Sequence, residues 1–154
     1  MADLNEVTAK VQRILANNWR VELRASGGFF VRLESTGCQI TCHQRPDDDD
    51  DDDDDERPVY IAISAAILFD VPVTNDLFRW VATEGADYRF GNAHLYLDES
   101  ETTAQLFFSH TLLGDYLDAE ELNYAVAAVG FTADRLDDEL LSLFGGRRAA
   151  DPAD

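Results

Sequence analysis

The stretch from His94 to Phe144 constrains the fold of this chain more than any other. It begins with an alternating run over 94–97, turns at a polar segment over 98–101, and continues as a longer alternating run over 103–113. One face of the second run is apolar and carries Ala104, Leu106, Phe108 and Leu112. Alternation with a period of two is typical of a half-buried antiparallel strand. The stretch therefore predicts a β-hairpin that exposes one face to water.

A helical pattern follows this hairpin. Its apolar residues recur at alternating steps of four and three, which places them on one side of a helix; they are Leu122, Val126, Val129, Ala133, Leu136, Leu140 and Leu143. Gly130 does not change the phase, so we expect one helix, from a capping box at Asp118 and Glu121 to Gly145. The simplest way to bury both apolar surfaces is to pack this helix on the sheet. Its acidic residues are expected to form a solvated face: Asp134, Asp137, Asp138 and Glu139.

The first half of the chain predicts another helix and more strands. A capping box at Asp3 starts a helix that ends near residues 17–18, and three alternating runs at 19–24, 29–34 and 38–43 indicate an antiparallel meander. In the first of these runs, Val21 and Leu23 are expected to face inward. A fourth run, 59–69, is apolar or small on both sides.

We interpret that fourth run as a central strand covered on both faces. If the helices of one chain cover a single face, a partner subunit is the hypothesis for the second cover. Ile67 is assigned to one face of this strand, and Ala66 and Leu68 to the other. A short helix containing Leu77 and Trp80 follows. The predicted fold class is α+β, an antiparallel sheet of five to six strands with an N-terminal helix, a short middle helix and a long C-terminal helix.

The domain prediction is a single unit over residues 1–146 that contains a disordered acidic loop at 46–57, followed by a flexible tail at 147–154. Nine consecutive aspartates, Asp47 to Asp55, lie in the loop. Adjacent carboxylates repel one another and bury nothing, so such a run is typical of disorder.

The formal net charge of −19 excludes several partner classes. Nucleic acids and anionic membranes both require basic protein surface, so neither is expected as a partner. The N-terminus lacks the apolar segment of a signal peptide, and no run approaches the length of a membrane span. We therefore expect a cytoplasmic location.

The usual catalytic signatures are missing from the sequence, and we expect no enzyme activity and no cofactor. A tight turn near residue 99 would place His94 opposite 105–107, away from His110, which argues against a metal-binding pair. Cys38 and Cys42 lie four residues apart on one strand face, about 13 Å at ~3.3 Å per residue, which is too far for a disulfide. Two core thiols are expected instead, and no metal site.

Three aromatic residues break their local patterns. Phe30 and Phe107 fall on the polar faces of their strands, and Phe131 falls outside the apolar stripe of the last helix. Scattered exposed aromatics are common, so this pattern alone is compatible with plain surface residues. The alternative is that Phe30, Phe107 and Phe131 contact a partner peptide or a second copy of the chain.

The order of elements resembles that of class I type III secretion chaperones, and more closely the YbjN-type, type III secretion chaperone-like family. The best local matches are the strand Phe90-Gly91-Asn92-Ala93-His94-Leu95-Tyr96-Leu97-Asp98 and the acidic entry to the last helix, Leu117 to Leu122. This resemblance covers about residues 3–144. It implies a small bacterial cytoplasmic protein, commonly a homodimer, that holds other polypeptides and has no catalytic site.

Two functional hypotheses follow from the sequence. The first is a non-catalytic, chaperone-like module that holds a segment of a partner polypeptide on its sheet or sheet edge. The second is an acidic regulator or decoy that binds a basic protein through charge. Salt distinguishes them, because charge-driven binding weakens as the screening length falls.

Overall fold

The computed structural model describes residues 3–44 and 57–152. The predicted disordered loop at 46–57 lies outside these residues except for Arg57. The elements in chain order are α1 (Leu4–Asn18), β1 (Val21–Leu23), β2 (Phe29–Arg32), β3 (Gly37–Gln44), β4 (Val59–Pro72), α2 (Asn75–Ala82), the 3-10 turn η1 (Glu84–Ala86), β5 (Asn92–Leu97), β6 (Thr103–Leu113) and α3 (Ala119–Phe144).

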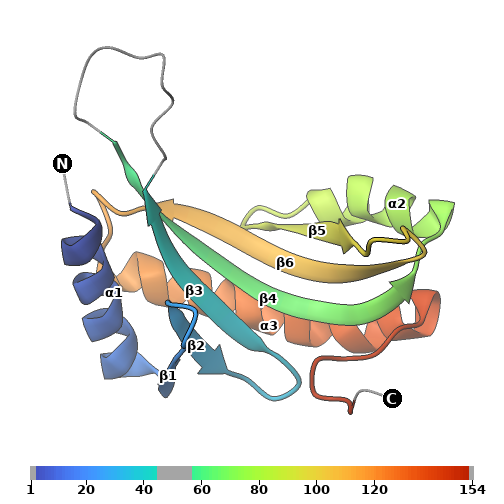
Figure 1. Ribbon diagram of the computed structural model, residues 1–154, viewed down its shortest axis with the longest axis horizontal. Coiled ribbons are helices and arrows are strands. Elements are labelled where there is room, and N and C mark those ends of the chain that lie inside the picture. The colour runs from blue at the N-terminus through green and yellow to red at the C-terminus, as the bar shows by residue number, and fades with distance from the viewer. Residues whose placement is uncertain (1–2, 45–56, 153–154) are drawn as a thin grey trace.

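The strands form one antiparallel sheet of six, in the order β1-β2-β3-β4-β6-β5. α1 packs against β3, and α3 crosses β4 and β6 on the same side of the sheet. Figure 1 shows α3 behind β4 and β6, with α1 at the left, so the viewer sees the side of the sheet opposite α3, which we call the open face. α2 lies near the β5 end, where Trp80 packs against Phe144 at the end of α3. The predicted α+β class and the arrangement of helices are confirmed.

The core lies between the sheet and the two long helices. The predicted apolar face of β6 is buried, and the stripe of α3 is buried from Leu122 to Leu140. Asp3 and Asp118 are the N-caps of α1 and α3, as predicted. Asp118 accepts from the backbone N–H of Glu121, as its capping box requires, whereas Asp3 accepts from Asn5 and not from Glu6. α3 runs without a break through Gly130, so the prediction of one helix is also confirmed.

The C-terminal end of the α3 stripe was predicted wrongly. Leu143 is 63% exposed, whereas Phe144 is partly buried against the core. An α-helix drifts by about 20° for each heptad step, so a stripe that repeats every seven residues turns gradually away from the sheet. The same drift brings Asp137 to the buried side, where it is 1% exposed. Asp137 therefore does not belong to the solvated acidic face; Asp138 and Glu139 do.

Two further residues lie on the opposite side from their predicted positions. Leu23 ends the short edge strand β1 and is 68% exposed. Leu68 pairs with Leu106 on the helix side, because the register shifts between Ala66 and Leu68; a second shift follows between Leu68 and Val71. β-bulges of this kind insert an unpaired residue and reverse the alternation beyond it. β4 is central, as predicted, but within the described residues the helices cover one of its faces and leave Tyr60, Ala62 and Ser64 half-buried on the other.

Asp137 joins α3 to the turn between β2 and β3. The backbone N–H of Ser35 donates to Asp134 at 2.9 Å, and the Ser35 hydroxyl contacts the carboxyls of both Asp134 and Asp137. A hydroxyl has one proton, so it donates to one carboxylate, and a protonated Asp137 can complete the chain by donating to the Ser35 oxygen. Burial raises the pKa of Asp137, against the lowering effect of the Ser35 hydrogen bond. Burial therefore shifts Asp137 toward the protonated acid, although the Ser35 contact opposes that shift.

Gly130 marks the closest approach of α3 to the sheet. A Cβ atom at this position would lie 2.1 Å from Leu33 Cδ1 and 2.9 Å from Cys38 Sγ. Both distances are shorter than van der Waals contact, so the glycine is required by packing and not by a turn.

We predict that Gly130→Ala destabilises the protein by about 1 kcal/mol, because overpacking costs roughly 1–3 kcal/mol and the gain in helix propensity is about 1 kcal/mol. Urea unfolding measures the change. In a Leu33→Ala background, which removes the closest atom and leaves the contact with Cys38, the same substitution should cost less stability. A stability increase in both backgrounds would contradict the packing role.

The buried acid gives a second prediction, for stability against pH. Because the pKa of Asp137 is raised above its ordinary value near 3.8, the folded chain retains this proton at higher pH than the unfolded chain does. Ionisation of Asp137 therefore removes stability as pH rises above that value. We expect Asp137→Asn to gain stability relative to the wild type between pH 4 and 7, measured by urea unfolding. Glu139→Gln, which removes the same charge from an exposed position of α3, is the control, and an equal pH trend in both variants would refute the assignment.

Candidate functional site

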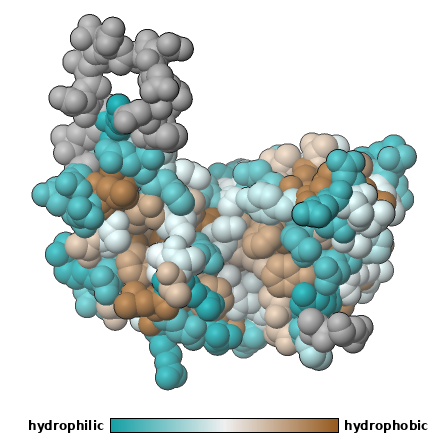
Figure 2. Space-filling view, viewed as in Figure 1, coloured by the Kyte–Doolittle hydropathy of each residue, from teal (hydrophilic) through white to brown (hydrophobic). Residues whose placement is uncertain are grey.

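A groove of about 640 Å³ lies on the open face of the sheet. Residues from β2 to β6 line it, and Ala149 and Ala150 from the C-terminal segment lie at its margin. Figure 2 views the molecule from this side and shows apolar patches interrupted by polar surface across the sheet. The groove is therefore a shallow trough across several strands and not a buried cavity.

One wall of the groove is a cluster of aromatic rings centred on Phe107. Its ring centroid lies 6.0 Å from that of Phe69 on β4, 5.5 Å from Tyr96 and 6.1 Å from His94 on β5. The Phe69 and Tyr96 rings meet Phe107 edge to face, an arrangement that the aromatic quadrupole favours. These rings stand on the water-exposed side of the sheet, where an alternating strand normally carries polar residues. Tyr96 remains 58% exposed.

Phe30 forms the opposite wall. The guanidinium of Arg24 lies 4.0 Å from the Phe30 ring centre, and that of Arg32 lies 5.5 Å away, within the range of cation–π attraction. The ring lies over Gly37 on β3, where a Cβ atom would come within 2.3 Å of Phe30 Cζ. Glycine at this position therefore allows the ring to lie close to the sheet.

The floor between the walls is made of small and polar residues, Gln39, Thr41, Ser64 and Ala66. Short side chains on the two central strands lower the floor, and the larger rings on either side raise the walls. Such a surface can contact the side chains of an extended chain through its rings and the polar groups of that chain through its floor.

The turn at Leu33 to Thr36 closes one end of the groove and is fixed to the rest of the protein. Ser35 is held by Asp134 and Asp137 of α3. The Thr36 hydroxyl donates to the carbonyl of Ala66 at 2.7 Å. This end of the groove is therefore anchored to α3 and to β4.

The structure brings two of the three predicted contact residues together. Phe30 and Phe107 line the same groove, whereas Phe131 lies on the outer side of α3, beside Tyr124 and Arg135 in a separate shallow hollow of about 420 Å³. Sequence reasoning missed Phe69 and Tyr96. Tyr96 alternates with Leu95 and Leu97 and could have been assigned to the polar face. Phe69 could not, because the bulges decide its direction.

The histidines and cysteines form no second site in the described residues. His94 pairs with Phe107 across the hairpin, as predicted, and His110 stacks on Phe90 at 4.0 Å. Burial lowers the pKa of both imidazoles, although the Asn92 backbone opposes the shift at His94 and Glu121 opposes it at His110. Cys38 and Cys42 are free thiols, and burial raises the pKa of Cys38 to about 12. Across residues 3–44 and 57–152, no cluster of three or more metal-ligating side chains occurs.

Comparison with known proteins gives one family. Residues 5–152 match the family described as TY-Chap1, T3SS (YopN, CesT) and YbjN peptide-binding chaperone 1. No curated protein gives a significant match to the chain. Among the helices of the described residues, none is long and apolar enough to cross a membrane. Because the match covers nearly the whole chain and confirms the resemblance seen in its motifs, the protein belongs to the T3SS and YbjN peptide-binding chaperone family.

Proposed function

We propose that this protein holds an extended segment of a partner polypeptide in the groove between Phe30 and Phe107, without catalysing a reaction. Membership of a peptide-binding chaperone family implies a peptide- or protein-binding, non-enzymatic role. The observation that carries the choice of surface is the pair of aromatic walls on a sheet face that should otherwise be polar. Aromatic residues at the centre of a concave surface are the usual anchors of protein interfaces.

The groove suits a peptide better than a folded domain. Its walls rise on both sides of a floor of short side chains, so a narrow strand can enter more easily than a flat protein surface. An extended chain presents alternate side chains to opposite sides, and those sides meet the rings of Phe30 and of Phe107. We expect side-chain contacts with these rings to contribute most of the affinity.

Phe107→Ser should weaken peptide binding by at least tenfold while leaving the fold intact, because the ring is a central wall residue but only half-buried. Peptides are first selected from a random display library on the wild-type protein, and their affinities are then measured by fluorescence anisotropy. Phe30→Ser should have a similar effect from the other wall.

Phe131→Ser is the matched control, since it removes the same ring from an exposed position outside the groove. Circular dichroism melts verify folding for each variant. Unchanged affinity in both Phe107→Ser and Phe30→Ser, or a loss in Phe131→Ser alone, would place binding elsewhere.

Sedimentation at micromolar concentration tests the homodimer, and a mass that falls with Phe107→Ser would identify a second copy as the occupant of the open face.

The charge of −19 supports the second candidate, an acidic regulator that attracts a basic protein. The same anisotropy measurement at about 0.1 M and about 1 M salt distinguishes the two, because the screening length falls from ~10 Å to ~3 Å. For groove binding we expect affinity to change less than about threefold. A loss that follows salt and is insensitive to Phe107→Ser would favour the charge-driven role.

A further inference from the structure

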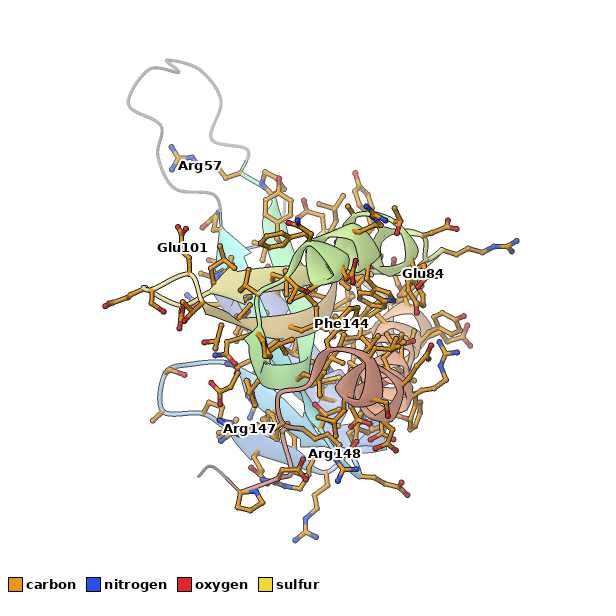
Figure 3. The ribbon with its side chains drawn as sticks, turned by 90° about the vertical axis from the view of Figure 1, so that its right-hand side faces the viewer. Arg57, Glu84, Glu101, Phe144, Arg147 and Arg148 are labelled. Atoms are coloured by element: carbon orange, nitrogen blue, oxygen red, sulfur yellow. The ribbon has the colours of Figure 1, made fainter. Side chains whose placement is uncertain are left out.

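The C-terminal segment returns to the sheet after α3 ends. Gly145 and Gly146 have φ angles of 80° and 93°, which reverse the direction of the chain. The backbone of Arg147 then exchanges two hydrogen bonds with Phe69 of β4, at 2.9 Å from its N–H and 2.8 Å to its carbonyl. Figure 1 shows this segment running from the end of α3 past β4, and Figure 3 places Arg147 and Arg148 on it. A flexible tail is expected over residues 147–154, and the first of these residues, Arg147, pairs with a strand.

The segment uses a free edge of β4. β3 pairs with β4 as far as Cys38 opposite Ala65, so beyond Ala66 no other strand of the described residues lies at this edge of β4. Arg147 pairs with this edge in antiparallel orientation, at the position beside β4 that β3 would occupy if it extended further. An unpaired stretch of this kind is a template for an added strand.

The side chains of the segment match the surface they meet. The Arg147 guanidinium lies 5.0 Å from the centre of the Phe69 ring, and its Nε donates to Asp70 at 2.8 Å. Ala149 and Ala150 follow and line the groove. The segment therefore presents a basic residue at the strand edge, then Arg148, which pairs with Asp138 and Asp151, and then two small apolar residues.

We propose that this segment occupies one end of the peptide groove as an internal ligand, and that a partner displaces it with a strand of the same chemistry. The partner strand carries a basic residue over Phe69 and Asp70 and small residues at the positions of Ala149 and Ala150. This inference rests on the proposed function and specifies the partner and its competitor. The segment is held by one bridge and by two ion pairs of partly exposed side chains, Arg147 with Asp70 and Arg148 with Asp138, and exposed pairs of this kind contribute little to stability. Because it is tethered, it competes at a high effective concentration.

The test uses a fluorescent peptide with the sequence of residues 144–152 and the full-length chain. Arg147→Pro removes the backbone donor to Phe69 and the guanidinium together. We expect it to bind the peptide at least fivefold more tightly than the wild type, because the internal competitor is released. Arg147→Ala keeps the backbone bond and should give a smaller gain. Arg135→Ala, which removes a positive charge from the outer side of α3, should give none.

The amides provide a second readout. On addition of the peptide to the wild type, hydrogen exchange by NMR should accelerate at Arg147 and stay slow at Phe69, since the peptide replaces the segment at the same edge. Equal peptide affinity in wild type and Arg147→Pro, or no binding of this peptide while display-selected peptides still bind, would overturn the inference and leave the proposed function standing. Failure of the display-selected peptides as well would remove the proposed function itself.

Discussion

The packing of α3 against one face of the antiparallel sheet determines the rest of this structure. The stripe from Leu122 to Leu140 buries the apolar sides of β4 and β6, and Gly130 allows the helix to approach Leu33 and Cys38 closely. Because one helical layer satisfies the apolar face, the other face of the sheet stays open. The open face is then available for a groove. Its aromatic residues lie outside the core between the sheet and the helices, so core packing does not account for them.

The groove depends on constraints that originate in the core. The bulges in β4 direct Phe69 to the open face, where it meets Phe107, and they turn Leu68 toward the helices. Asp134 and Asp137 hold the turn at Ser35 from the helix side, so one end of the groove is fixed by α3. The free edge of β4 exists because β3 begins at Gly37, and the C-terminal segment takes that edge. Helix packing, strand irregularity and the proposed peptide groove are thus linked through a few residues.

Local patterns were sufficient to predict the elements and to single out two residues that line the groove. Period-two alternation identified β6 and its buried face, the capping boxes located the starts of α1 and α3, and aromatic residues on polar faces identified Phe30 and Phe107. The directions of some side chains were not predicted, because they depend on geometry that accumulates along an element or joins distant residues. The drift of the helix placed Asp137 inside and Leu143 outside, and two bulges decided the direction of Leu68 and Phe69. The bridge between Arg147 and Phe69 joins residues far apart in sequence, and no local pattern indicates it.

The most direct test of the account is the position of a bound peptide. Intermolecular NOEs between a display-selected peptide and the aromatic rings of the full-length protein would locate it without mutation. The account predicts contacts from the peptide to the rings of both Phe30 and Phe107, with none to Phe131. Contacts confined to Phe131 and Tyr124 on the outer side of α3 would contradict it.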